Sequence, residues 1–257
     1  MGIYHKFLNH NFNKDFETRN SILETVPYEP ETIFIGTFNH GWEWNQADFF
    51  YGRGMYFWPI LANLFIYNNN ELISRRSLNN DTPNFEEILE ICKTAKITFA
   101  DIVKGTSEGV DCLTNEVNKA VLVGDNYQWN DYKDGHLDNL GNRGWIDDNV
   151  TDIINYINKT KTIKNVYFTF KSGNWIVNKK NQILAGIRND VEVSSIFTPT
   201  ANGFRENLEA PFNERAWSLA HCWVWNGLEH DVPVNKLGYG NLSHDWLIKN
   251  GVDIDNF

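Results

Sequence analysis

The sequence predicts an α/β protein with a mostly parallel sheet that is covered by helices on both faces. Short apolar runs typical of buried strands alternate with segments of helical spacing, at distances that suit β-α-β crossovers. In addition, the polar and aromatic clusters of the chain directly follow the predicted strands. Ligands of such sheets bind beyond the carboxyl ends of the strands, so these clusters indicate a site at one edge of the sheet.

Length and composition fit a single globular domain. The chain has 257 residues, of which 42% are hydrophobic and 22% charged, and a chain of this size buries a substantial core. We expect one domain over residues 1–257, with an N-terminal extension at 1–30 and an insertion or lid at 120–148, where Asn, Asp and Gly are frequent. Neither a secretory signal nor a membrane span of about 20 apolar residues is expected.

The overall charge argues weakly against a protein that binds nucleic acid without specificity. The formal net charge is −10 and the pI is about 5.2, whereas such a protein normally has a basic face. Local basic patches can nevertheless coexist with an acidic remainder. The candidates are Arg75 with Arg76, residues 159–164, and Lys171 with Lys179 and Lys180, and each also fits an ordinary solvated surface.

The cysteine and histidine patterns predict no metal site. Three cysteines lie far apart and form no CxxC pair, namely Cys92, Cys112 and Cys222. This usage is typical of a reducing compartment, so we expect a cytoplasmic protein. The seven histidines form no HxH or HxxxH pair, and no Walker loop or GxGxxG motif follows a strand. We therefore expect neither a metal nor a cofactor.

The predicted elements run from the N-terminus as follows. Residues 15–25 have helical spacing and stop near Pro27, so a helix is expected there. Residues 32–38 are an apolar run typical of a buried strand, and 54–67 are typical of a helix with Pro59 in its first turn or at a kink. Further helices are expected at 84–95, 150–160, 172–187 and 213–228, and further strands at 96–103 (ending at Asp101), 163–170 and 191–197.

The loop after the first of these strands has the residues of a catalytic site. Gly36 permits a tight exit from the strand and close approach of a ligand. Asn39 has both donors and an acceptor, so it can bind an amide edge or a water. His40 could donate to a developing negative charge, and Asp48 could act as a base. The alternative is a turn with an Asx motif at Asn39.

Aromatic side chains crowd the same loop. Phe38, Phe49, Phe50 and Tyr51 could stack on a planar ring, as aromatic residues do in pockets for flat ligands. Their alternative role is to complete the edge of the core. Both interpretations fit the composition, because the chain has seventeen Phe, ten Tyr and ten Trp.

Two further loops have groups that suit a nucleic-acid ligand. In residues 198–205, Thr198, Thr200 and Asn202 could hold a phosphate, with Phe204 as a wedge and Arg205 as a phosphate clamp. The same segment also fits a plain polar connection between a strand and a helix. In the other loop, the Asp that ends the strand at 96–103 could be a catalyst or a cap.

Four segments resemble the motif blocks of the uracil-DNA glycosylase superfamily, nearest the hypoxanthine (deoxyinosine)-DNA glycosylase branch. They are IFIGTFNHGWEWNQADFFYGRGMYFWPIL at 33–61, ITFADIVKGTSEGVDCLTNEV at 97–117, NVYFTFKSG at 165–173 and SSIFTPTANG at 194–203. The first is similar to a strand, a GxxP-like loop, a YYG segment and an NRFW-type helix start. It departs from the family where Asn39 replaces the proline and where Met55 or Tyr56 replaces the asparagine of NRFW.

This resemblance implies a three-layer α/β/α sandwich with a central four-stranded parallel sheet. It implies metal-free hydrolysis of the N-glycosidic bond of a flipped deaminated or modified base, in DNA, by a monomer. Asn39 would hold the water or the base edge, and Asp48 would activate the water. The remaining roles would be base stacking by Phe38 and Phe50, the pocket wall by Tyr51, a phosphate grip by Thr198, Thr200 and Asn202, and a wedge by Phe204.

Two other classes of function stay open at this point. One is a catalytically inactive module on the same fold that binds nucleic acid or protein. The other is a hydrolase of small nucleosides, which the acidic composition would suit. A variant of the glycosylase interpretation is a defence enzyme that acts on bulky modified cytosines of foreign DNA.

Overall fold

The structure is a computed structural model that describes residues 4–41, 45–52, 57–67, 82–106, 134–170 and 173–195. The chain divides into two compact units, one of residues 1–46 and 98–192 and the other of residues 47–97 and 193–257.

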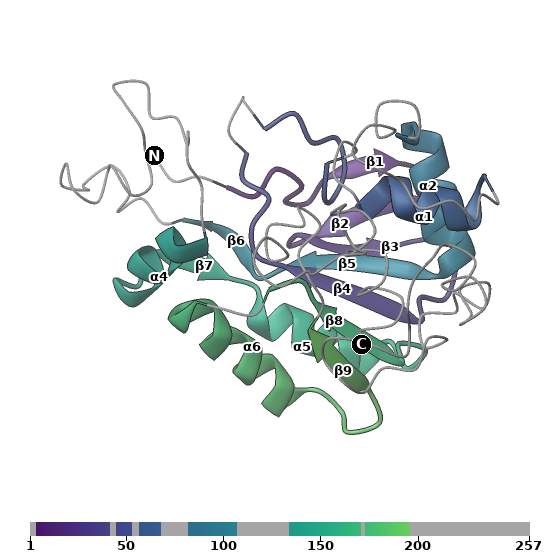
Figure 1. Cartoon of the computed structure of the whole chain (residues 1–257). Coiled ribbons are helices and arrows are strands. Elements are labelled where there is room, and N and C mark those ends of the chain that lie inside the picture. Colours follow the sequence, from purple (N-terminus) through teal and green to yellow (C-terminus); the bar gives the residue numbers. More distant parts are fainter. Residues whose placement is uncertain are drawn as a thin grey trace, which may run out of the picture. The chain divides into compact units, whose positions relative to one another are not determined.

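A mixed sheet of seven strands has the order β1-β2-β3-β5-β4-β8-β9 (Figure 1). Its strands are β1 (Asn11–Asn13), β2 (Phe16–Arg19), β3 (Ile22–Thr25), β4 (Thr32–Gly36), β5 (Ile97–Asp101), β8 (Asn165–Phe168) and β9 (Glu192–Ser195). The four strands predicted from apolar runs are neighbours, in the order β5-β4-β8-β9. β4 and β8 are parallel, with Thr32 opposite Asn165 and Ile35 opposite Phe168. The protein is therefore mixed α/β, with a larger sheet than the four strands expected.

The N-terminal region 15–25 is a β-hairpin, so the prediction of a helix there was wrong. β2 pairs antiparallel with both β1 and β3, and β3 pairs antiparallel with β5. Asn20 and Ser21, which join β2 to β3, have φ of 49° and 57°, as in the left-handed two-residue turns that suit the twist of a hairpin. Phe16 and Thr18 are buried at the strand period of two. The apparent helical spacing came from two short strands separated by this turn.

The middle of the sheet is an apolar core that fixes where β4 and β5 end. All five residues of each strand are buried. The ring of Phe34 in β4 stacks on Phe99 of β5 at 5.8 Å and on Tyr167 of β8 at 5.6 Å between ring centroids. Aromatic pairs of this kind add about 0.5–1.5 kcal/mol each beyond the area they bury. This ladder holds the carboxyl ends of the strands, and hence their loops, on a rigid base.

Three helices of the first unit lie on one side of the sheet (Figure 1). α5 (Val150–Lys159) and α6 (Asn174–Gly186) agree with the predicted helices, while α4 (Asp134–Asn142) was not predicted. β6 (Val103–Thr106) pairs antiparallel with β7 (Ile146–Asp148) in a separate two-stranded sheet. The predicted insertion at 120–148 thus contains α4 and β7, and its first part lies outside the described residues.

The second unit contains α1 (Phe57–Phe65) and α2 (Phe85–Ala95), both close to the predicted ranges. Pro59 lies in the first turn of α1, where the missing N–H costs nothing. α2 begins with a capping box between Asn84 and Glu87. The predicted helix at 213–228 lies outside the described residues. Within the described part of the chain, no helix is both long and apolar enough to cross a membrane.

Candidate functional site

Strands β4 and β5 end side by side and send their loops to the same edge of the sheet. The backbone N–H of Ile102 donates to Gly36 O at 3.1 Å, and that of Val103 donates to Thr37 O at 3.0 Å. Gly36 is buried at the end of β4. Because of these bonds, the loop that contains Asn39 and the residues that follow Asp101 leave the sheet together. This juxtaposition is what the sequence predicted for these two loops.

A third segment, residues 4–7, lies between them and is called the N-terminal clip below. The N–H of His5 donates to Lys104 O at 2.8 Å, that of Lys6 donates to Asn39 O at 2.7 Å, and that of Gly41 donates to Tyr4 O at 2.8 Å. The clip is thus hydrogen-bonded on both sides, to the β4 loop and to β6. Sequence reasoning left this region as an extension without a role. In the structure its side chains alternate, with Tyr4 exposed, His5 buried, Lys6 half-buried and Phe7 buried, but the letters of this segment do not show that alternation.

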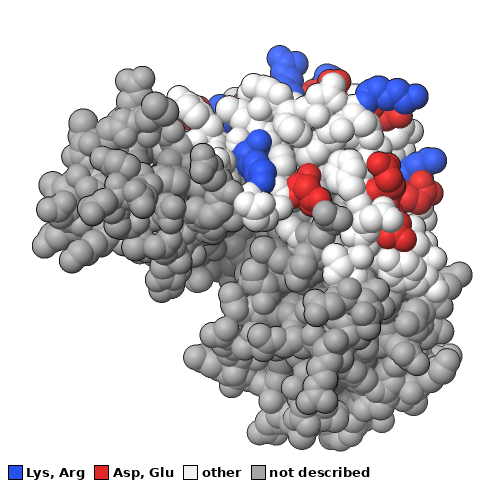
Figure 2. All heavy atoms as spheres, turned by 90° about the horizontal axis from the view of Figure 1, so that it is seen from above, with Lys and Arg blue, Asp and Glu red and all other residues white. Residues whose placement is uncertain are grey.

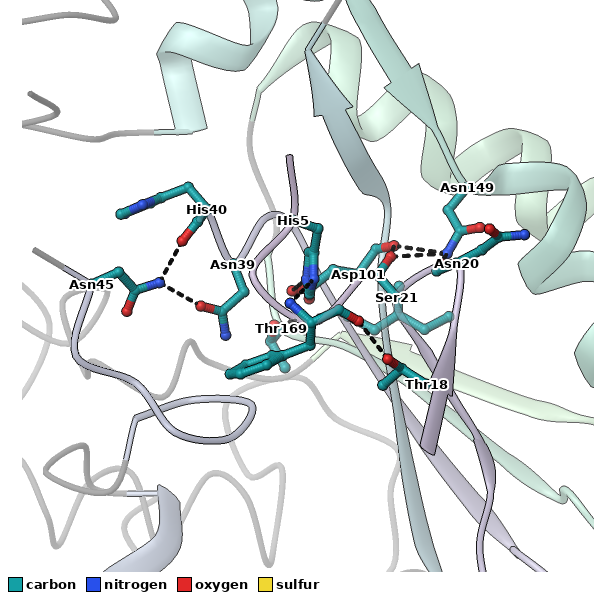
Figure 3. Close-up of polar contacts among 12 residues, drawn as sticks. His5, Thr18, Asn20, Ser21, Asn39, His40, Asn45, Asp101, Asn149 and Thr169 are labelled. Atoms are coloured by element: carbon teal, nitrogen blue, oxygen red, sulfur yellow. Dashed lines mark hydrogen bonds and ion pairs between the residues drawn. The ribbon is translucent and has the colours of Figure 1, made fainter. Parts of the chain in front are cut away.

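The Asn39 side chain is held by Asn45 (Figure 3). Asn45 Nδ2 donates to His40 O at 2.8 Å and to Asn39 Oδ1 at 2.7 Å. A carbonyl oxygen can only accept, so the contact with His40 identifies the nitrogen of Asn45, and the second contact then identifies the oxygen of Asn39. Within the described ranges, no group accepts a hydrogen bond from Asn39 Nδ2. The half-buried amide therefore presents its donor.

His40 follows Asn39 and is a neutral imidazole near physiological pH. Its residue is only 6% exposed. Burial lowers the pKa of His40 to about 4, with smaller contributions from the positive charge of Lys6 and from His5. A neutral ring has one N–H donor and one acceptor nitrogen. His40 can therefore act as a hydrogen-bond donor without being an acid in its charged form.

Lys6 brings a positive charge to the same loop. Its Nζ donates to the backbone oxygen of Asn45, and its charge also contributes, after burial, to the lowered pKa of His10. The side chain lies next to the amide pair of Asn39 and Asn45 through this contact. The β4 loop and the clip together thus present an amide donor, a neutral imidazole and an ammonium group, which is a set of groups suited to an anion or a polarised carbonyl.

His5 and Asp101 form a buried pair behind this loop. His5 Nε2 lies 2.7 Å from Asp101 Oδ2, and the two side chains are 0% and 6% exposed. The other ring nitrogen, Nδ1, accepts from Phe7 N–H at 3.0 Å. An acceptor cannot hold a proton, so the proton lies on Nε2 and is donated to the carboxylate. The ring is fixed in one tautomer and one orientation.

The other predicted base-binding residues are mostly enclosed. Phe38 is buried, and its ring lies 6.2 Å from each of the His5 and His40 rings, measured between centroids. Phe50 belongs to the second unit and is 1% exposed, beside Phe49 at 5.5 Å. Burial to this extent favours a packing role for Phe50.

Tyr51 and Asp48 are also in the second unit. Tyr51 is half-buried with a left-handed backbone (φ 53°), and its ring packs against Phe57 at 4.8 Å. Asp48 is half-buried. Their catalytic and base-binding roles stay predictions. The predicted DNA-backbone residues Thr198, Thr200, Asn202, Phe204 and Arg205 lie outside the described residues.

The described residues contain no metal-ligand cluster, and their surface charges are of both signs (Figure 2). Among the described residues, no three His, Cys, Asp or Glu side chains are grouped so that they could hold a metal ion. On the described part of the face in Figure 2, Lys and Arg side chains lie among Asp and Glu side chains. Charges of both signs on this surface agree with the acidic composition and do not single out a nucleic-acid partner.

Comparisons with known proteins show only a distant similarity. No protein-family model matches the chain, and no curated protein matches it. Among solved structures, the chain is similar to the NMR structure of a protein from Methanosarcina acetivorans that was provisionally named a uracil DNA glycosylase. The identity is 16%, the TM-score is 0.37, and the similarity covers 79% of this chain and 92% of that chain. A likeness of this degree carries no argument about the fold or the activity of the present chain.

Proposed function

We propose that this protein is a DNA glycosylase that hydrolyses the N-glycosidic bond of a flipped deaminated or otherwise modified base. The observation that carries the proposal is the Asn39 amide, whose oxygen Asn45 binds at the carboxyl edge of the sheet while its nitrogen has no acceptor among the described residues. The resemblance of residues 33–61 to the first motif block of the uracil-DNA glycosylase superfamily supplies the reaction class.

The proposed chemistry uses donors that act on the leaving base. As the glycosidic bond breaks, the sugar becomes oxocarbenium-like and the base gains negative charge. Asn39 Nδ2 would donate to a carbonyl oxygen of the base, and the neutral His40 would add a second donor. Lys6 would stabilise the same charge over a longer distance. Groups that are already oriented before the reaction pay no reorganisation cost at that moment, which is why such contacts contribute strongly to rate.

Water activation and DNA binding belong to other residues in this proposal. Asp48 is the candidate that activates the water. Phe38 and Tyr51 would border the base, with Phe50 packed behind them, and the segment 198–205 would contact the DNA backbone. The bound DNA would carry the modified base extruded from the stack, because the bond cannot be reached within a duplex.

The test replaces Asn39 in two ways and measures base excision. Asn39→Ala removes the whole amide, while Asn39→Asp keeps the volume and an acceptor for Asn45 but removes the donor. The substrates are oligonucleotides with uracil, hypoxanthine, xanthine or modified cytosines, and alkaline cleavage of the abasic product is the readout. We expect both variants to lose about 10²–10³ in single-turnover rate while substrate binding changes little. Activity that is fully retained, or lost only in proportion to unfolding, would make Asn39 a structural turn residue.

A second candidate is a hydrolase of small nucleosides. The net charge of −10 favours it. The two candidates differ in their response to salt, because phosphate contacts release counterions and make DNA binding weaken steeply as salt rises. Binding and turnover that do not change between about 50 and 200 mM salt would favour the nucleoside hydrolase.

A further inference from the structure

We propose that His5 is a positioning residue of the candidate site. Through its pair with Asp101 it holds the N-terminal clip against the β4 loop, and the clip fixes the Asn39 amide. The catalytic consequence of this inference rests on the proposed glycosylase function. Its structural part, in which His5 fixes the Asn39 amide through the clip, is independent of that function.

His5 cannot act on a substrate itself, because both of its ring nitrogens are engaged. Nε2 faces Asp101 Oδ2 at 2.7 Å, Nδ1 accepts from Phe7 N–H at 3.0 Å, and the side chain is 0% exposed. A general base needs a nitrogen that can reach the proton it removes. The ring is instead a rigid link between the clip and the end of β5.

Asp101 is a fixed anchor for this link. It is the last residue of β5, its N–H donates to Ser21 O at 3.3 Å, and its carbonyl accepts from Ser21 Oγ and Asn149 Nδ2, each at 3.3 Å. Asn149 also donates to the backbone oxygen of Asn20. These bonds join the end of β5 to the turn of the β2–β3 hairpin and to the start of α5.

The clip is hydrogen-bonded to the β4 loop through Tyr4 and Lys6, the residues on either side of His5. Lys6 N–H donates to Asn39 O at 2.7 Å, and Tyr4 O accepts from Gly41 N–H at 2.8 Å, so His5 lies opposite His40 in an antiparallel bridge. The Lys6 ammonium also donates to Asn45 O. The clip therefore holds both members of the amide pair, Asn39 by its backbone and Asn45 by its carbonyl.

Substitutions at His5 and at Asp101 separate the effect of the hydrogen bond between them from the effect of the Asp101 charge. His5→Ala removes the link, whereas His5→Gln places an amide N–H near the position of Nε2. Asp101→Ala removes the acceptor and leaves a neutral imidazole behind, which is less costly than a buried unpaired carboxylate. Asp101→Asn keeps an acceptor oxygen without the charge. If His5→Ala does not fold, the two Asp101 variants decide the question.

The first measurement is independent of any activity. In the wild-type protein, the side-chain amide protons of Asn39 and Asn45 give NMR signals that report their hydrogen bonds. We expect His5→Ala and Asp101→Ala to move both pairs of signals toward random-coil positions, and His5→Gln and Asp101→Asn to restore them. Signals that stay in place in His5→Ala and Asp101→Ala would overturn the inference.

The second measurement is single-turnover excision with the oligonucleotide panel. A displacement of about 1 Å at a catalytic group can cost about 10²-fold in rate, so we expect a loss of that size in the two Ala variants, little change in DNA binding, and rescue by Gln and Asn. If Asp101→Asn abolishes excision while the amide signals stay in place, Asp101 takes part in the chemistry and the positioning role is wrong. If the wild-type protein excises no base, the proposed function fails, and the amide signals alone decide the role of His5.

Discussion

Asn45 determines which atom Asn39 presents to the site. Its Nδ2 bridges Asn39 Oδ1 at 2.7 Å and His40 O at 2.8 Å. The bridge uses both hydrogens of one amide and leaves the other amide with only one orientation that satisfies the contact. Asn45 was not among the site residues predicted from the sequence, yet it determines that Asn39 presents its nitrogen to the site.

Asn45→Asp is expected to reverse the orientation of the Asn39 side-chain amide. A carboxylate only accepts, so it would repel Asn39 Oδ1 and His40 O, and the Asn39 amide would turn its nitrogen toward position 45. The free energy of unfolding should fall by about 1–2 kcal/mol, as for loss of partly buried hydrogen bonds, and excision should fall as in Asn39→Ala. Gln46→Glu adds the same charge at the adjacent exposed residue and serves as the control in urea unfolding and single-turnover assays. Equal behaviour of the two variants would contradict the bridge.

His40 is expected to titrate far below an ordinary histidine. Its pKa is lowered from 6.5 to about 4, so as the pH falls below 6.5 the unfolded chain binds a proton that the folded chain does not. Its contribution therefore reduces stability progressively from about pH 6.5 down to about pH 4, with a slope of at most about 1.4 kcal/mol per pH unit. NMR titration of the ring and urea unfolding at several pH values, compared with His40→Gln, measure this. A midpoint near 6.5 would show that the ring is solvated.

Gly41→Ala is expected to push the clip away from the β4 loop. A Cβ at this position would lie 2.8 Å from Tyr4 O, a backbone atom that can move only with the clip. Overpacking of this kind typically costs about 1–3 kcal/mol, and the Asn39 amide signals should shift. Gly52→Ala is the control, because its Cβ would meet Ala47 at an ordinary 3.7 Å. A fully stable Gly41→Ala protein with unchanged signals would mean that the clip is loosely held.

Asp138→Ala is expected to destabilise α6 and leave the site intact. The Asp138 carboxylate accepts from the first N–H groups of α6, Asn174 at 2.8 Å and Trp175 at 2.6 Å. Loss of such a cap costs about 1–2 kcal/mol. Asp15→Ala changes an exposed carboxylate and should stay within about 0.5 kcal/mol of the wild type in thermal unfolding. Shifted Asn39 signals in Asp138→Ala would mean that α6 supports the site.

The sequence predicts the strands of the sheet centre because most of their residues are apolar. Phe34 and Phe99 have no alternative to burial, and a strand that is buried on both faces needs no periodicity to be recognised. The hairpin at 15–25 was missed because its turn is Asn20-Ser21, which lacks the glycine that normally marks a left-handed turn.

The position of the candidate site could be predicted from the sequence, but the contacts among its residues could not. Asn39 and His40 follow a recognisable buried strand, and their position was predicted. The roles of His5 and Lys6 depend on contacts with residues more than 30 positions away, and no local pattern reports such contacts. Asn45 was missed for a different reason, since an isolated Asn in a polar loop looks like any turn residue.

The distance along the chain between His5 and Asp101 has a consequence for the order of folding. The two residues are 96 positions apart. At a synthesis rate of about 5–20 residues per second, Asp101 is therefore made roughly 5–20 s after His5. The β2–β3 hairpin, with two residues in its turn, closes a far smaller loop and can form much earlier. We expect the long-range contact between His5 and Asp101 to form after the folding transition state. Contacts that form at this late stage affect mainly the unfolding rate. Weakening the His5–Asp101 link should therefore leave the folding rate nearly unchanged and make the protein unfold faster.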